Sequence, residues 1–414
     1  MMNPFFFIIL FALLIEYAIG VAANLFNLKS LRSEPPPTLE GVYQPEDYRK
    51  SQEYIRTNTR FDFVTSTFSL VVLLSFWFAG GFNYLDQIVV RSWGFVPILN
   101  GLFYIGILLI GYSLLTLPFS IYRTFVIEER FGLNRTTPRT FLVDRIKGLG
   151  LAALIGAALL SGILALFEYV GYYAWIYCWI AVTVFSLILQ YIAPTWIMPL
   201  FNKFTPLEPG ELKEAILNYA HSVDFPIKNV FVMDGSKRSS KSNAFFTGFG
   251  HNKRIALFDT LIKKHTVPEL IAVLAHEIGH HKKRHILQGT IINILHLGVL
   301  FFVLSIFLGS SGLYDAFYME QQSIYSGILF FGLLYTPLEM VLSVIMHVLS
   351  RKNEYEADRF AAETIQHPQH LIEALKKLYA GNLSNLVPHP FYVFLNYSHP
   401  PLLQRIRAIL RYEA

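Results

Sequence analysis

The residues of this chain best suited to metal chemistry stand in the stretch HEIGH, at positions 276–280. In a helix, residues four apart share a face, so His276 and His280 can each offer a ring nitrogen to one metal ion. Glu277 stands beside them, where its carboxylate can take a proton from a metal-bound water. Two ligands and a general base in this spacing predict the zinc site of a peptidase.

The residues before this motif predict the helix that carries it. Thr266 and Glu269 have the spacing of a capping box, and Pro268 falls in the first turn, so the helix should begin there. The alternative is a pair of surface histidines on a basic helix, because HKKRH follows directly at 281–285. We favour the zinc site because of what lies further along the chain.

A third ligand is expected, because a catalytic zinc usually takes three protein ligands and leaves one position for water. The best candidate lies in SRKNEYEAD, residues 350–358. Glu354 and Asp358 share one helical face, so Glu354 can bind the metal while Asp358 orients a ligand histidine. Glu356 is on another face and would be the ligand only if the helix were placed differently. The alternative is an ordinary charged helix end below a membrane span.

The composition places this site in a membrane protein. Of the 414 residues, 53% are hydrophobic and only 15% are charged, which is less charge than a soluble globular domain carries. Cys178 is the only cysteine, which excludes a disulfide framework and a cysteine-based zinc site. No Gly-rich phosphate loop or nucleic-acid motif stands out, so we expect a lipid bilayer and no nucleic acid among the partners.

Seven apolar segments are long enough to cross a bilayer. The first lacks a positively charged start and is long for a signal peptide, so we interpret it as an uncleaved helix. The segments lie at about 4–24, 63–82, 95–118, 148–168, 173–196, 287–309 and 324–349.

The loops between these segments alternate in charge. Those after the first, third and fifth segments and the C-terminal tail are rich in Lys and Arg, whereas the loop after the second has only Arg91. The loops after the fourth and sixth segments have no Lys or Arg. Basic loops stay in the cytoplasm, which predicts an outside N-terminus and a cytoplasmic catalytic site and C-terminus.

The expected fold is mainly α, a polytopic membrane protein with a zincin-like α+β catalytic domain on the cytoplasmic side. Four parts follow along the chain: 1–196 with five spans, 197–286 with the catalytic motif, 287–349 with two spans, and 350–414 with the third ligand. In the catalytic segment we expect a helix at 210–223 and β-like runs at 229–234, 243–250 and 254–262. His251 and Asn252 have the character of a hairpin turn.

Several longer blocks resemble one family. Besides HEIGH and SRKNEYEADRFA, they are TFVIEERFGLNRTT (124–137), PTWIMPLFNKFTPLEPGEL (194–212), SNAFFTGFG (242–250), RIALFDTLI (254–262) and NLVPHPFYVFLNYSHPPLLQRI (385–406). On these blocks the chain is identified as a member of the integral-membrane zinc metallopeptidases that include CAAX prenyl protease type I, with the HtpX heat-shock proteases as more distant relatives. The resemblance implies seven helices around a large water-filled chamber.

The resemblance also implies a role for each residue of the metal site. His276, His280 and Glu354 would bind one zinc ion. Glu277 would be the general base and then the proton donor.

Further roles follow for the substrate. By the resemblance, His399 in YSHPP would stabilise the oxyanion and Arg405 would support the substrate or the site geometry. Asn243 would line the substrate groove, at the start of a strand with Ala244 and Phe245 that could hold an extended peptide. Otherwise His399 is a turn residue before two prolines, and Asn243 merely starts a strand.

Other ionisable residues have weaker functional signals. We interpret the run EER at 128–130 as an interfacial ion-pair cluster, which the family places near the site entrance. Ionisable groups inside the spans are more often pair partners or interface anchors than catalysts. Such groups are Glu16, His296, Glu339 and His347; Glu339 follows Pro337, where a kink could turn it towards the chamber.

The predicted function is a membrane zinc metalloendopeptidase that resembles CAAX prenyl protease type I and removes three C-terminal residues from prenylated proteins. One alternative is an HtpX-like quality-control protease acting on membrane or misfolded proteins. Another is a transporter or channel, which would give no reason for HEIGH and Glu354 together. We expect a bacterial inner-membrane protein, with the endoplasmic reticulum as the other location.

Overall fold

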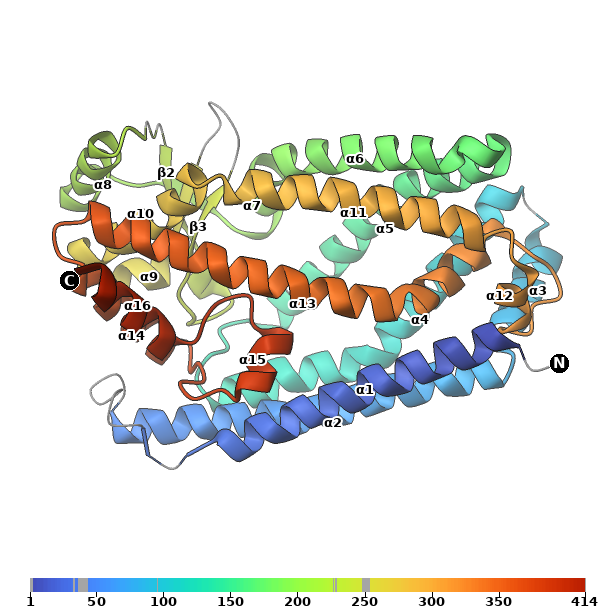
Figure 1. Cartoon of the computed structure of the whole chain (residues 1–414), viewed down its shortest axis with the longest axis horizontal. Coiled ribbons are helices and arrows are strands. Elements are labelled where there is room, and N and C mark those ends of the chain that lie inside the picture. Colours follow the sequence, from blue (N-terminus) through green and yellow to red (C-terminus); the bar gives the residue numbers. More distant parts are fainter. Residues whose placement is uncertain are drawn as a thin grey trace.

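The computed structural model describes residues 3–413 apart from 33, 36–43, 95, 226, 228 and 248–253. Figure 1 shows the chain as a long bundle of helices with a small sheet at one end. In chain order the elements are α1 (Pro4–Ser30), α2 (Pro45–Phe78), α3 (Gly81–Trp93), α4 (Pro97–Tyr122), η2 (Arg123–Glu128), α5 (Pro138–Tyr169), η3 (Gly171–Tyr173), α6 (Ala174–Ile192), η4 (Ala193–Ile197), α7 (Met198–Phe201), β1 (Phe204–Pro206), α8 (Glu211–Ser222), β2 (Asn229–Met233), η5 (Gly235–Lys237), β3 (Ala244–Thr247), β4 (Arg254–Phe258), α9 (Asp259–Lys264), α10 (Val267–Lys282), α11 (His285–Phe307), α12 (Ser311–Asp315), α13 (Ile324–Thr364), α14 (Gln369–Gly381), α15 (Pro390–Asn396) and α16 (Leu402–Glu413).

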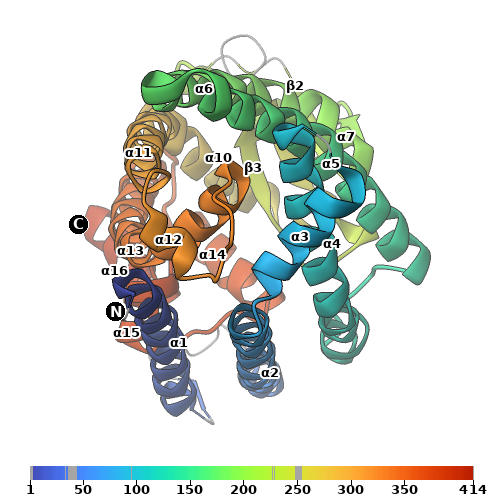
Figure 2. The same cartoon turned by 90° about the vertical axis from the view of Figure 1, so that its right-hand side faces the viewer.

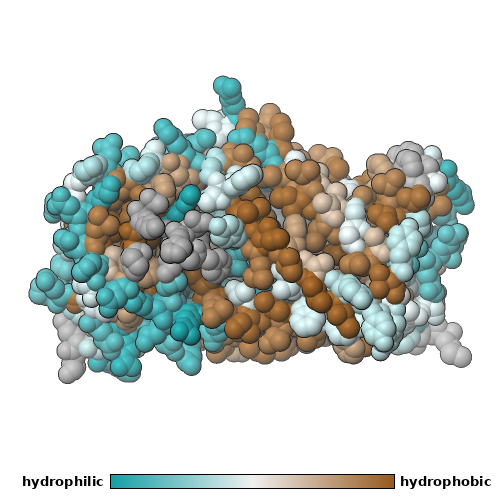
Figure 3. Space-filling model, turned by 90° about the horizontal axis from the view of Figure 1, so that it is seen from above, coloured by the Kyte–Doolittle hydropathy of each residue, from teal (hydrophilic) through white to brown (hydrophobic). Residues whose placement is uncertain are grey.

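Seven helical stretches of the described chain are long and apolar enough to cross a membrane, and each coincides with a predicted segment. Five of them are the single helices α1, α2, α5, α11 and α13. Another consists of α4 and η2, and another of η3, α6, η4 and α7 in succession. Their outward faces carry large apolar side chains such as Leu109, Leu154 and Leu295, which are 60–73% exposed. Figure 3 shows these faces as a continuous hydrophobic band between two hydrophilic ends. The protein is therefore a multi-pass integral membrane protein.

Two of the helices continue well beyond their predicted apolar segments, at the end of the molecule that holds the sheet. The helix α2 begins at Pro45, and α13 runs on to Thr364 over 41 residues. The apolar pattern shows only the part that lies in lipid, whereas helical hydrogen bonding continues as long as the backbone permits. The extension of α13 is what carries Glu354 and Asp358 into the catalytic part.

The opposite end is closed by short helices. The stretch after the second span, expected as a loop, contains α3, whose side chains Phe82 and Val89 are buried. Phe82 packs edge-on against Phe317 and Phe330, with ring centroids 5.4 Å apart in each pair. With 13 residues, α3 is too short to cross a bilayer, so it caps this end instead.

A four-stranded sheet stands at the catalytic end, in the order β1-β2-β4-β3. The strands β2 and β4 are parallel, while β1 and β3 pair antiparallel on the outside, so β3 is an edge strand. The predicted helix at 210–223 is confirmed as α8. The prediction of β structure through 262 is wrong at its end, because α9 begins at Asp259, whose carboxylate accepts a hydrogen bond from the Ser236 backbone.

The proposed turn at His251 and Asn252 lies outside the described residues. The strands on either side of it, β3 and β4, do pair as a hairpin would. β1 was not predicted, since three residues are too few to show an alternating pattern. The four-part division of the chain made from the sequence stays a prediction.

Viewed along its length, the molecule is a ring of helices (Figure 2). A cavity of about 960 Å³ lies between α1, α2, α3, α4 and α13, and a smaller one of about 550 Å³ lies between α1 and α13. The larger cavity has polar groups on its wall, including Glu16, Asn24 and Asp62. The ring of helices agrees with the prediction, whereas a chamber enclosed by all seven stays a prediction, because these two cavities are lined by four of the seven, α1, α2, α4 and α13.

Candidate active site

The site forms where α10 crosses the inner extension of α13. The capping box predicted at the start of α10 is present: the Thr266 backbone N–H donates to the Glu269 carboxylate at 2.8 Å. The two helices pack closely at Gly279, where an added Cβ would lie 3.1 Å from the Cα and the carbonyl oxygen of Ala357. The glycine of HEIGH is thus needed because a backbone passes over it.

The three predicted metal ligands come together at this crossing. The Nε2 atoms of His276 and His280 are 3.1 Å apart. The Glu354 carboxylate lies 3.5 Å from His276 Nε2 and 3.3 Å from His280 Nε2. The side chain of Glu354 is only 5% exposed, and its Oε2 accepts no hydrogen bond from the described residues. Such a group of ligand atoms around a buried, unsatisfied oxygen is typical of a metal site.

The outer nitrogen of His276 faces the carboxylate of Asp358. Its Nδ1 lies 2.9 Å from Asp358 Oδ1, and Asp358 is fully buried. Arg405 holds that carboxylate with two hydrogen bonds, at 2.8 Å from Nε and 2.6 Å from Nη2. Burial alone would lower the pKa of His276, but the neighbouring carboxylates of Asp358 and Glu354 outweigh burial and raise the pKa to about 9.

The outer nitrogen of His280 has a different partner, which sequence reasoning missed. His280 Nδ1 lies 3.0 Å from Nδ1 of the buried His285, and His285 Nε2 lies 3.2 Å from Glu356 Oε2. If His280 binds a metal through Nε2, its Nδ1 carries the proton and donates to His285. His285 then donates from Nε2 to Glu356. Glu356, which the sequence did not favour as a metal ligand, therefore supports the ligand His280 through His285.

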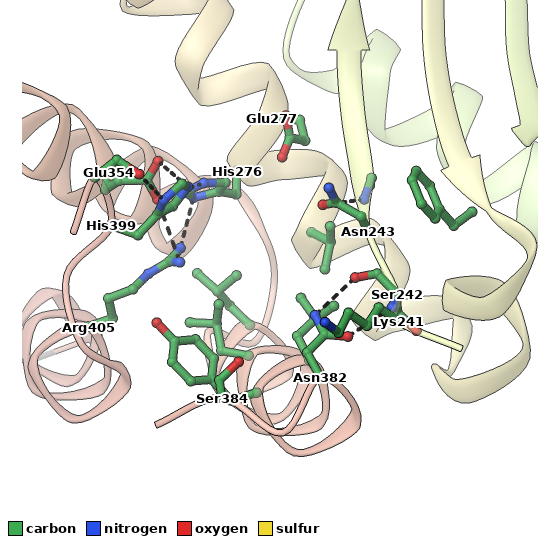
Figure 4. A pocket seen from close by; sticks show the side chains of 18 of the residues that line it. Lys241, Ser242, Asn243, His276, Glu277, Glu354, Asn382, Ser384, His399 and Arg405 are labelled. Carbon is green, nitrogen blue, oxygen red and sulfur yellow. Dashed lines mark hydrogen bonds and ion pairs between the residues drawn. The ribbon is translucent and has the colours of Figure 1, made fainter. Parts of the chain in front are cut away.

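Glu277 lies between His276 and the sheet (Figure 4). It follows His276 on α10 and lines the same cavity. Burial raises the pKa of its carboxyl group above the ordinary value, while the nearby His276 and His280 lower it. A carboxylate with a raised pKa is better suited to accept and return a proton near neutral pH.

A cavity of about 640 Å³ extends from this cluster to the first residues of β3. Asn243 and Ala244 line it, as expected for the strand start. Phe245 is not among the lining residues; it packs edge-on against Phe258, with ring centroids 6.2 Å apart. Successive side chains of a strand point to opposite sides, so only some of the three can face one groove.

His399 lies on the other side of the cluster. Its Nε2 is 3.2 Å from Glu354 Oε1, and its Nδ1 is 2.9 Å from the Ser398 hydroxyl. The side chain is 60% exposed and lines the cavity, so it is open to a ligand. Arg405, in contrast, is only 5% exposed and is held by Asp358.

The cavity is also lined by residues that no sequence pattern pointed to. They come from the loop before β3, from α14 and from the chain after it, and include Lys241, Ser242, Tyr379, Asn382 and Ser384. Asn382 joins two of these walls, because its amide accepts from the Ser242 backbone N–H at 2.9 Å and donates to the Ser242 carbonyl at 3.2 Å. Polar residues in loops far apart along the chain have no periodicity from which this meeting could be predicted.

Several of the remaining ionisable groups have charged or polar partners in the structure. Glu128 accepts a hydrogen bond of 2.5 Å from Tyr54 and lies 3.3 Å from Lys241 Nζ. Within the spans, His296 lies 3.4 Å from Glu339. Of the other two residues at 128–130, Glu129 accepts a hydrogen bond from Asn134, and Arg130 forms an ion pair with Glu53 of α2.

Comparison with known protein families decides the assignment. Residues 206–413, which contain the whole cluster, match the model of peptidase family M48. Residues 24–203 match the CAAX prenyl protease N-terminal model, described as five membrane helices. The chain belongs to family M48. It is a membrane metallopeptidase, and the cluster on α10 and α13 is its candidate metal site.

Individual relatives are similar in sequence to this protein along nearly the whole chain. It is 37% identical to the probable CAAX prenyl protease 1 of Schizosaccharomyces pombe, covering 92% of this chain and 82% of that protein. It is 36% identical to CAAX prenyl protease 1 of Saccharomyces cerevisiae, with 90% and 88% covered. The crystal structure of S. mikatae Ste24p has a TM-score of 0.93 at 34% identity, with 99% of this chain and 100% of that chain covered. These matches favour neither the HtpX-like role nor the transporter.

Proposed function

We propose that this M48 peptidase uses one zinc ion to remove the three C-terminal residues of prenylated C-a-a-X proteins. The observation that carries the proposal is the convergence of His276, His280 and Glu354 beside Glu277, on the wall of a cavity at the inner end of seven membrane helices. The relatives named as CAAX prenyl proteases support the substrate class.

The donor set fits zinc. Two imidazole nitrogens at Zn–N distances of 2.0–2.1 Å in a tetrahedral site stand about 3.3 Å apart, and here the two Nε2 atoms are 3.1 Å apart. The unsatisfied Oε2 of Glu354 supplies the third ligand atom. Two nitrogens and one oxygen leave a fourth position open, as in catalytic zinc sites.

A zinc ion held there would polarise the scissile carbonyl and lower the pKa of a water molecule. Glu277 takes the proton from the attacking water and returns it to the leaving amine. Its raised pKa suits both steps.

His399 and Arg405 have different roles in this proposal. His399 is exposed to the cavity and close to the ligand carboxylate, so its imidazole can donate to the carbonyl oxygen as negative charge builds there. Arg405 is buried and holds the Asp358 carboxylate that orients His276, and its Nη1 also lies 3.6 Å from the Glu354 carboxylate. We therefore treat Arg405 as a positioning residue.

The peptide would add to the free edge of β3. An edge strand presents unpaired backbone groups that can bind an extended peptide, and Asn243 and Ala244 bring this edge to the cavity. Asn243 and Ala244 then contact the substrate, while Phe245 supports the strand through Phe258.

For topology we propose an outside N-terminus and a cytoplasmic site, on the alternation of basic loops. Prenylated C-termini are exposed in the cytoplasm, which supports the same orientation. The prediction of a bacterial inner membrane stays a prediction, with the endoplasmic reticulum as the alternative; the relatives named above are from eukaryotes.

A comparison of two peptides tests the substrate class. The purified zinc-loaded protein is given a farnesylated C-a-a-X peptide and the same peptide without the farnesyl group. We expect release of the C-terminal tripeptide and a clear preference for the farnesylated peptide in kcat/KM. Equal cleavage of both peptides would contradict a prenyl-dependent function and would favour a general membrane protease.

A further inference from the structure

The cavity has a polar end across from the metal cluster. Figure 4 shows Lys241, Ser242 and Asn382 on one side and Glu354, His399 and Arg405 on the other. Four Lys, Arg, Asp or Glu side chains line the described cavity. Three of them, Glu277, Glu354 and Arg405, belong to the metal cluster, so Lys241 is the one charge at the polar end.

Lys241 has capacity for a further partner. Its Nζ lies 3.0 Å from the Tyr54 hydroxyl and 3.3 Å from the Glu128 carboxylate. An ammonium group has three N–H donors, so these two contacts leave one. The Lys241 side chain is 39% exposed and keeps access to the cavity.

A second unused polar group lies next to it. Ser242 is 4% exposed and lines the cavity, and its hydroxyl has no hydrogen-bond partner among the described residues. A buried hydroxyl without a partner is costly, and an acceptor arriving with a ligand would satisfy it. A cation and a free hydroxyl on adjacent residues are suited to bind a carboxylate.

Strand direction brings the C-terminus of a substrate to this point. A peptide that pairs antiparallel with β3 runs from the 247 end towards the 241 end, so its C-terminus leaves past Asn243 towards Lys241. The cavity follows the same direction, because its lining includes Ser239 and residues 241–244 and none of the later residues of β3. The three C-terminal residues of an extended substrate span about 10 Å. Asn243 and Ala244 together with the Lys241 side chain can cover a similar length.

We propose that Lys241, assisted by the Ser242 hydroxyl, binds the free C-terminal carboxylate of the substrate and so sets the cut three residues from the end. This inference rests on the function proposed above and adds to it a determinant of where cleavage occurs. Asn382 holds the loop in place through its two hydrogen bonds to the Ser242 backbone.

Peptides with a free or an amidated C-terminus test this inference. The full-length zinc-loaded protein is assayed on four peptides: farnesylated and unprenylated, each as the acid and as the amide. We expect the acid to be preferred by about tenfold in kcat/KM, mostly through KM, since a hydrogen bond to a charged group contributes on this order. Lys241→Met should abolish the preference by lowering kcat/KM for the acid peptide to the value for the amide peptide. Lys241→Arg should retain the preference.

Lys264→Met is the matched control. Lys264 is a nearby lysine whose Nζ donates to the Ser240 carbonyl at 2.8 Å, but it is not among the cavity-lining residues. This variant should keep the preference for the acid.

The two proposals can fail separately. Equal cleavage of acid and amide by the wild-type protein would overturn the carboxylate site, whatever the effect of farnesylation. Equal cleavage of farnesylated and unprenylated peptides would contradict the proposed substrate class, while the acid and amide pair still decides the role of Lys241. The wild-type comparison does not depend on the folding of any variant.

Discussion

Both metal-facing histidines are held at their outer nitrogens, but by different partners. Asp358, clamped by Arg405, accepts from His276. His285, backed by Glu356, faces His280. Each contact fixes which nitrogen of the histidine carries the proton and how its ring is turned. Groups behind metal ligands commonly change metal affinity by 10–100-fold when they are removed.

Asp358→Asn should weaken zinc binding by roughly 10–100-fold, because the buried site loses the charge that holds both His276 and Arg405. Zinc affinity is measured by competition with a chelator. Glu363→Gln is the control, since Glu363 lies on the same helix but pairs only with exposed Arg359. An unchanged zinc affinity in Asp358→Asn would show that this carboxylate does not orient the ligand.

His285→Phe should lower zinc affinity by about tenfold, because a phenyl ring fills similar space but accepts no hydrogen bond from His280. Glu356→Gln should have a smaller effect. Since Glu356 acts through His285, the double variant should bind zinc no more weakly than His285→Phe alone. Additive losses in the double variant would mean that Glu356 affects the site by another route.

At the level of elements, the crossing of α10 and α13 sets the site. Gly279 is a point of close approach, and a methyl group there would press on the backbone of Ala357 at 3.1 Å. One helix carries His276, His280 and Glu277 and the other carries Glu354, so any separation of the helices moves the ligands apart.

Gly279→Ala should destabilise the protein by about 1–3 kcal/mol, the usual cost of overpacking, and should weaken zinc binding as well. The thermal unfolding midpoint and the zinc affinity are the readouts. Gly289→Ala on α11 is the control, because nothing lies within 4 Å of its added Cβ. If both variants behaved alike, the close helix crossing would not be what shapes the site.

Local sequence patterns predicted much of this architecture. Apolar length located the seven spans, and the four-residue spacing put His276 with His280 and Glu354 with Asp358. His285 escaped prediction because its position depends on the left-handed backbone of Arg284, with φ of 60°, which starts α11 in a new direction.

The cavity wall was predictable only in part. Lys241, Tyr54 and Glu128 come from three segments far apart along the chain, and no local pattern records their contact. α3 was missed because its 13 residues read as a loop between two spans.

At the level of the whole molecule, the two larger of the hydrophobic cores formed by the described residues lie towards opposite ends. One surrounds α10 and the sheet and includes Ile216, Leu261 and Leu274; the other joins Trp77, Phe317 and Phe330 at the far end. The helices between them carry apolar side chains outward, which requires lipid around the middle of the molecule (Figure 3). The catalytic end therefore projects from one face of the membrane.

Cysteine labelling in a Cys178→Ala background tests which face this is. Tyr172→Cys lies at the far end, at a side chain 81% exposed, and Glu214→Cys lies on the exposed surface of α8. In intact spheroplasts of an expressing bacterium, an impermeant thiol reagent should label position 172 alone. Position 214 should react only after permeabilisation. Labelling of 214 in intact spheroplasts would reverse the proposed topology.

The account depends above all on a zinc ion that works with Glu277. The most direct measurement compares wild-type protein with Glu277→Gln for bound zinc and for cleavage of the farnesylated C-a-a-X peptide. We predict about one zinc per chain in both proteins, because Glu277 is not a ligand, and loss of cleavage in the variant. No zinc in the wild-type protein, or equal cleavage by both, would contradict the account.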